Sequence, residues 1–195
     1  RLEQGDGAIA FYNAGSGSAD GAITWTERLR ISADGQITGG SDAQYNTTLG
    51  GNAGDSFTGT DASGNTLIGY DAGTSITTGD NNVAVGRIAL DSTTTGGDNT
   101  AVGAWSLGAN TTGTQNVSIG NYALDANTTA SNNVALGYNS LGANTTGDSN
   151  TAVGTNSMIT NTVGDRNVAV GNGALYTYNP ASNEDSYNTA VGYAA

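Results

Sequence analysis

The sequence predicts an all-β fold, a repetitive parallel β-roll or β-solenoid of 17-residue coils with a small β module at its N-terminal end. Three observations support this prediction. A glycine returns every 17 residues over most of the chain, and the residues around it keep the same types in the same order. The intervening segments are too rich in Gly and β-branched residues for a helix of useful length. A strict short period of this kind is typical of stacked, identical units.

The first 40 residues do not follow the period. Residues 8–12 form one apolar segment, and residues 22–31 alternate apolar and polar side chains, so both are predicted strands. Residues 13–21 between them are rich in turn formers, and Asp34-Gly35 predicts a tight turn before a third segment at 36–38. We therefore divide the chain into a β-hairpin or connector module at 1–40 and a nine-repeat β-roll at 41–195.

Each repeat is marked by one glycine and by one asparagine four residues before it. The spacing is 17 residues from Gly69 to Gly171, and the first and last intervals are longer, at 19 and 21 residues. The repeat glycines are Gly50, Gly69, Gly86, Gly103, Gly120, Gly137, Gly154, Gly171 and Gly192. The repeat asparagines are Asn46, Asn65, Asn82, Asn99, Asn116, Asn133, Asn150, Asn167 and Asn188.

The residues between Asn and Gly, such as Val83-Ala84-Val85, predict a strand of four to five residues in each coil. The glycine ends the strand, either because it adopts a positive φ or because another backbone approaches closely. Stacking places Asn above Asn, so we expect a ladder of side-chain amide hydrogen bonds along the rod. Segments such as 110–113 and 144–147 are interpreted as polar turns.

A 17-residue coil carries about three large apolar side chains, which is too few to enclose a dry core alone. The Val column before the glycine and the Leu column after it lie on separate segments, so one can line the coil and the other can face a partner chain. We therefore expect a homotrimer about the rod axis. Nine coils at about 4.8 Å per rung predict a rod of roughly 40 Å.

Composition excludes several classes of function. The chain carries 17 acidic and five basic residues, a net charge of −12, which argues against binding to nucleic acid or anionic lipid. It has no His, Cys or Lys, so the usual general base, thiolate and Schiff-base chemistries are missing. We predict no enzyme activity, no cofactor and no metal site. No apolar run is long enough to insert into a membrane.

Turn carboxylates and aromatic side chains offer two candidate sites. Asp80, Asp98, Asp148 and Asp165 precede the repeat asparagines and are interpreted as solvated, with calcium binding as the alternative. Several aromatic residues fall shortly after a repeat glycine, where other copies carry Arg87 or Asn121, so we expect them to be exposed. The candidate glycan contacts are Tyr70, Trp105, Tyr122, Tyr138, Tyr176 and Tyr178; packing against a neighbouring rung is the competing interpretation.

Residues 82–90 and 99–107 resemble the head repeats of trimeric autotransporter adhesins. Their Asn-Thr-Ala-Val-Gly motif, with the intervening Asn-Thr-Thr-Gly, is still more similar to the repeats of phage tail-fibre proteins, and residues 27–35 are similar to a segment that precedes such repeats. The resemblance covers roughly residues 27–195. It implies a trimeric parallel β-roll. Adhesin repeats usually have a shorter period, so the 17-residue spacing favours the phage-like branch.

The leading hypothesis is a trimeric spacer or display rod of a phage tail fibre or a related extracellular filament, which contacts host-surface polysaccharide or glycoprotein. Its location would be the virion tail or a cell surface. The first alternative is a trimeric adhesin head. An ice-binding solenoid is a second, because Thr77, Thr94, Thr111, Thr128, Thr145 and Thr162 form a regular column. A polysaccharide depolymerase is the least supported, since Glu184-Asp185 is the one acidic pair that interrupts the period.

Overall fold

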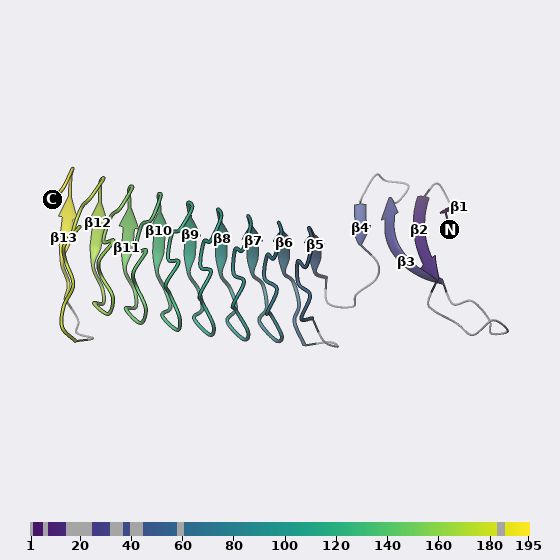
Figure 1. Cartoon of the computed structure of the whole chain (residues 1–195), viewed down its shortest axis with the longest axis horizontal. Coiled ribbons are helices and arrows are strands. Elements are labelled where there is room, and N and C mark those ends of the chain that lie inside the picture. Colours follow the sequence, from purple (N-terminus) through teal and green to yellow (C-terminus); the bar gives the residue numbers. More distant parts are fainter. Residues whose placement is uncertain are drawn as a thin grey trace.

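The structure is a computed structural model of the whole chain. It describes residues 2–5, 8–14, 25–31, 37–39, 45–57, 61–182 and 186–195. These residues form thirteen strands and no helix. The strands belong to two sheets, an antiparallel one near the N-terminus and a parallel one that runs along the rest of the chain (Figure 1).

The N-terminal sheet contains four antiparallel strands in chain order, with a register shift between Phe11 and Tyr12 where β2 pairs with β3. The strands are β1 (Leu2–Gly5), β2 (Ala8–Ala14), β3 (Trp25–Ile31) and β4 (Ile37–Gly39). β2 confirms the first predicted strand and continues through Asn13 and Ala14, at the start of the predicted turn. β3 confirms the second predicted strand over residues 25–31, and residues 22–24 lie outside the described residues. The predicted turn at Asp34-Gly35 lies outside the described residues. The division of the chain at residue 40 stays a prediction.

The second sheet contains nine parallel strands, each paired with the strand of the next coil, so that the chain makes about eight solenoid turns (Figure 1). The strands are β5 (Thr47–Leu49), β6 (Thr66–Ile68), β7 (Val83–Val85), β8 (Thr100–Val102), β9 (Val117–Ile119), β10 (Val134–Leu136), β11 (Thr151–Val153), β12 (Val168–Val170) and β13 (Thr189–Val191). Equivalent residues of neighbouring repeats are paired throughout, as Ala84 is with Ala101. The predicted solenoid is confirmed.

Each solenoid strand has three residues rather than the expected four to five. The repeat glycine ends it for both of the predicted reasons. Gly103 has φ 133°, and a Cβ built there would lie 2.6 Å from the carbonyl carbon of Gly120 in the next coil. An L side chain at this corner would therefore be strained and would also collide with the neighbouring backbone.

Three further corners of the coil adopt a left-handed conformation, usually without glycine. They lie two, four and twelve residues after the repeat glycine, as in Trp105 (φ 63°), Leu107 (φ 51°) and Gln115 (φ 59°). A left-handed residue costs about 1–2 kcal/mol when it is neither Gly nor Asn. The fold tolerates this cost because the backbone at each corner is hydrogen-bonded to the next or the preceding coil, as Leu107 N–H is to the carbonyl of Ala123 at 3.0 Å.

The core closes within a single chain. The Leu column after the repeat glycine is fully buried, from Leu90 to Met158, together with the small Ala or Ser side chains at the centres of β7 to β12. The expectation that one chain has too few large apolar residues to enclose a core was therefore wrong. Small side chains and buried asparagines fill the space that larger apolar residues would otherwise need to occupy.

Two ladders of buried asparagine run through this core. In the ladder of repeat asparagines, Asn116 Nδ2 donates to Asn99 Oδ1 at 3.1 Å, and Asn133 N–H donates to Asn116 Oδ1 at 3.0 Å. This confirms the predicted ladder. The second ladder contains Asn110, Asn127, Asn144 and Asn161, which are also fully buried. The residues at 110–113 and 144–147 are turns, as predicted, but their asparagines point into the core and not into solvent.

The two longer repeats differ in how much of them is described. Phe57, in the first, is half-buried and packs on the core. In the second, Pro180 and Tyr178 lie against Gly164, where an added Cβ would be 2.9 Å from Pro180 Cγ. Glu184 and Asp185, the acidic pair that interrupts the period, lie outside the described residues.

Candidate functional site

The outward side of the nine-strand sheet carries a row of exposed apolar residues along the solenoid. In β6 to β12 the central residue is buried, and the first and third residues are exposed or half-buried on the outer side. We call the first and third residues of all nine strands the strand face. The first positions are Thr47, Thr66, Val83, Thr100, Val117, Val134, Thr151, Val168 and Thr189; the third positions are Leu49, Ile68, Val85, Val102, Ile119, Leu136, Val153, Val170 and Val191.

The strand face is exposed and carries no charge. All its members are Val, Ile, Leu or Thr, although the chain has 22 charged residues. Eight of its larger apolar members expose between 36 % and 70 % of their surface. At strand and residue spacings of about 4.8 and 3.3 Å, the face measures roughly 40 by 10 Å. An exposed apolar strip of about 400 Å² is a candidate surface for interaction.

The burial of the two apolar columns shows which of them lies inside the solenoid. The Leu column lines the coil, and the Val column, which is the third position of each strand, points outward. Sequence reasoning left this choice open because both columns recur with the same period. The alternation of exposed, buried and exposed residues along each strand follows from the pleat, which places the small central residue in the core.

The candidate aromatic residues are divided between two places. Tyr70, Tyr122 and Tyr138 expose 54 %, 40 % and 52 % of their surface, and Trp105 is half-buried. All four lie at the corner that follows the strand, on successive or nearly successive coils. The Tyr122 and Tyr138 rings meet edge to face with their centroids 6.0 Å apart. Arg87 occupies the same corner, with its guanidinium carbon 5.7 Å from the Trp105 ring centroid.

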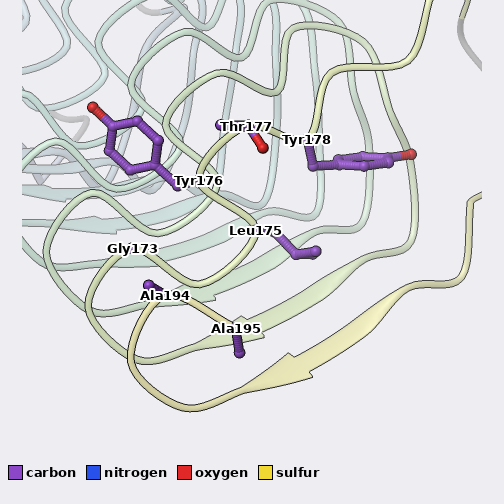
Figure 2. Close-up of a pocket in the computed structure, with 7 residues that line it drawn as sticks. All are labelled: Gly173, Leu175, Tyr176, Thr177, Tyr178, Ala194 and Ala195. Carbon is purple, nitrogen blue, oxygen red and sulfur yellow. The ribbon is translucent and has the colours of Figure 1, made fainter.

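Tyr176 and Tyr178 lie apart from this group, near the last coil. Both line a shallow pocket with Leu175, Ala194 and Ala195, but Figure 2 shows their rings pointing in opposite directions. The Tyr178 ring packs on Gly164. The pocket lies over Leu175, in the position that the following coil covers elsewhere in the solenoid. These two tyrosines therefore do not join the other aromatic residues in one surface.

The threonine column considered for ice binding uses its hydroxyl groups within the protein. Thr111 Oγ1 donates to the carbonyl of Thr128 at 2.9 Å, and Thr94 Oγ1 donates to that of Thr111 at 3.2 Å. The column is also half-buried. Because these hydroxyl protons are used in hydrogen bonds within the protein, the column does not offer a regular array of hydroxyl donors to water.

The turn carboxylates that were considered for calcium accept hydrogen bonds from the preceding coil. Asp148 Oδ1 accepts from Ser131 N–H at 2.6 Å, and Asp165 Oδ1 accepts from Asp148 N–H at 2.7 Å. Asp98 occupies the next position of the turn and does not share this column. No group of three or more potential metal ligands is found in the part of the chain that the structure describes.

Two other carboxyl groups are perturbed by the fold. Burial raises the pKa of Asp125, and burial also raises the pKa of Asp91, where a hydrogen bond from Thr74 opposes it and the charge of Asp71 adds to it. Both groups stay partly open to solvent, and the carboxylate of Asp71 is a second acid near Asp91.

Comparisons of the chain with family models, with curated proteins and with solved structures returned no match. The resemblance to tail-fibre and adhesin repeats therefore stays a prediction from the motifs. Within the described residues, no helix has the length and apolar character needed to cross a membrane.

Proposed function

We propose that this chain is a structural segment of a self-associating fibre, a homotrimeric spacer or display rod of a phage tail fibre or a related extracellular filament. The observation that carries the proposal is the strand face. An uncharged apolar strip of about 400 Å² along the whole solenoid is costly in water, and association with other copies buries it. The adhesin-head alternative uses the same architecture and the same association.

The shape of the strand face is compatible with a cyclic assembly such as a trimer. It has two columns, one rich in Thr and Val and one of Val, Ile and Leu. In a cyclic arrangement about an axis parallel to the rod, each chain has two neighbours, and each column packs on the other column of one neighbour. All chains then run in the same direction, as a fibre requires.

Solution mass tests this proposal. Light scattering behind size exclusion should give three times the chain mass of 19.4 kDa. The double variant Ile119→Lys/Leu136→Lys places two charges on the strand face and should convert the trimer to monomer, since a buried unpaired charge is costly. The control Thr112→Lys/Thr129→Lys adds the same charge at exposed turns outside the face and should stay trimeric. A wild-type monomer would contradict the proposal.

Ice binding remains a second candidate through the strand face and not through the threonine column. The face offers methyl and hydroxyl groups in a regular array with repeats of about 4.8 Å along the rod and about 6.6 Å across it. Thermal hysteresis of the wild type, lost in Ile119→Lys/Leu136→Lys, would favour this function. Its absence in a trimeric wild type would exclude ice binding and leave the fibre segment and the adhesin head as candidates.

A further inference from the structure

Five side chains, four of them aromatic, lie in a row at one corner of successive coils, beside the strand face. We call it the aromatic stripe: Tyr70, Arg87, Trp105, Tyr122 and Tyr138. They follow β6 to β10, one member on each of five successive coils, at the corner just after the repeat glycine. With about 4.8 Å between coils, the stripe is on the order of 20 Å long and runs parallel to the rod.

The stripe is held on a rigid backbone. Ile88 N–H donates to the carbonyl of Tyr70 at 2.9 Å, and Trp105 N–H donates to that of Arg87 at 3.0 Å, so neighbouring corners are tied together coil by coil. The side chains also touch one another, through the Arg87–Trp105 and Tyr122–Tyr138 contacts. A partner that stacks on these rings would not have to order them first, which lowers the cost of binding.

The fold does not need aromatic residues at this corner. The coil of β11 has Thr155 and Asn156 at the same two positions, and the coil of β12 has Asn172 and Gly173. These coils keep the same strand register and the same buried core. The aromatic residues of the stripe are therefore additional to what the solenoid requires, which points to a role in binding.

We infer that the aromatic stripe binds a neutral polysaccharide, laid in an extended conformation along the rod. A pyranose ring has an apolar C–H face that packs on an aromatic ring. Its hydroxyl groups pair with side-chain amides such as Asn121 Nδ2, which is exposed at the same corner, while Asn121 Oδ1 accepts from Ala104 N–H at 2.9 Å. A chain with a net charge of −12 repels anionic polymers, and the single Arg of the stripe already contacts Trp105. Charge therefore selects a neutral glycan.

This inference goes beyond the proposed spacer function and does not depend on trimer formation. The test is native affinity electrophoresis of the full chain through gels that contain dextran, mannan or laminarin, with anionic alginate as the charged comparison. The variant Trp105→Asn/Tyr122→Asn/Tyr138→Thr gives the stripe the residue types that the coil of β11 carries at the same positions, so it should fold. The control Tyr176→Thr/Tyr193→Thr removes two exposed tyrosines outside the stripe.

We expect at least one neutral polysaccharide to retard the wild type and the control, and the stripe variant to bind it at least about tenfold more weakly. Lack of retardation by all three neutral polymers, equal retardation of the stripe variant, or stronger retardation by alginate would each overturn the inference. The mass of every sample is measured alongside, so a failure to trimerise is distinguished from a failure to bind.

Discussion

Asn116 should contribute more to stability than its polar side chain suggests, because it lies at the centre of the buried amide ladder. Its Nδ2 donates to Asn99 Oδ1 at 3.1 Å and to the carbonyl of Ala130 at 2.9 Å, and its Oδ1 accepts from Asn133 N–H at 3.0 Å. The side chain is fully buried, so water cannot replace these bonds. We consider the replacement Asn116→Ala.

The expected loss in the free energy of unfolding depends on which hydrogen bonds the partners of Asn116 keep after the replacement. Asn99 Oδ1 still accepts from Asn116 N–H, and the Ala130 carbonyl still accepts from Asn127 Nδ2. Asn133 N–H, in contrast, loses its side-chain acceptor, and an unpaired buried donor costs about 1–3 kcal/mol. The two donated bonds add about 0.5–1.5 kcal/mol each. The free energy of unfolding should therefore fall by about 2–6 kcal/mol.

Guanidinium unfolding followed by far-UV circular dichroism measures this loss, at a fixed protein concentration because association contributes to stability. The matched control is Asn172→Ala, an exposed asparagine outside both ladders, which should change stability by less than about 0.5 kcal/mol. Hydrogen exchange should also show faster exchange at Asn133 N–H. A loss below about 1 kcal/mol, or one equal to that of the control, would refute the role of the ladder.

Three further predictions concern the corners and the carboxylates. Gly103→Ala should lower the melting temperature sharply, because φ 133° is strained for alanine and its Cβ would lie 2.6 Å from Gly120. Gly108→Ala should be tolerated, because the tight contact of its Cβ is with the movable Asp125 carboxylate at 3.1 Å and the nearest backbone oxygen lies at 3.4 Å. Gln115→Asn should raise the free energy of unfolding by up to about 1 kcal/mol in denaturant titrations, because asparagine adopts φ 59° more readily; an unchanged midpoint would contradict this. Burial raises the pKa of Asp125 in the folded state, so the folded protein binds the proton more readily and stability falls as the pH rises through that pKa. Asp125→Asn should therefore raise the melting temperature at pH 7, with a gain that shrinks as the pH falls below the usual range of Asp; a gain independent of pH would show that the charge is not responsible.

The repeat asparagines and glycines show how much of this fold could be predicted. Both recur in all nine copies, and a side chain that recurs in a stack of coils must satisfy a condition that the stack imposes. For the repeat asparagines this condition is the amide ladder, and for the repeat glycines it is the close approach of the next coil, as at Gly103. The exposure of Tyr70 and Tyr138 was also predictable, because the same position accepts Arg87.

The second ladder was missed, although a signal for it exists. Its column contains Asn110, Asn127, Asn144 and Asn161, but also Thr93 and Ile76 in earlier coils. A column that accepts isoleucine lies inside the protein, so its asparagines had to be buried too. The residue types of the segment do not indicate that its asparagine is buried, because Asn-Thr-Thr-Gly is typical of an exposed turn.

The sequence by itself determined the period, the parallel stacking and the amide ladder, because these depend on which residue types recur and at what spacing. Only the tertiary structure decided that the Leu column lines the core and the Val column forms the strand face. Both columns are apolar and both repeat every 17 residues, so their pattern is the same along the chain. The choice depends on the left-handed corners, where Leu107 and its equivalents turn inward at φ values that no sequence pattern predicts for leucine.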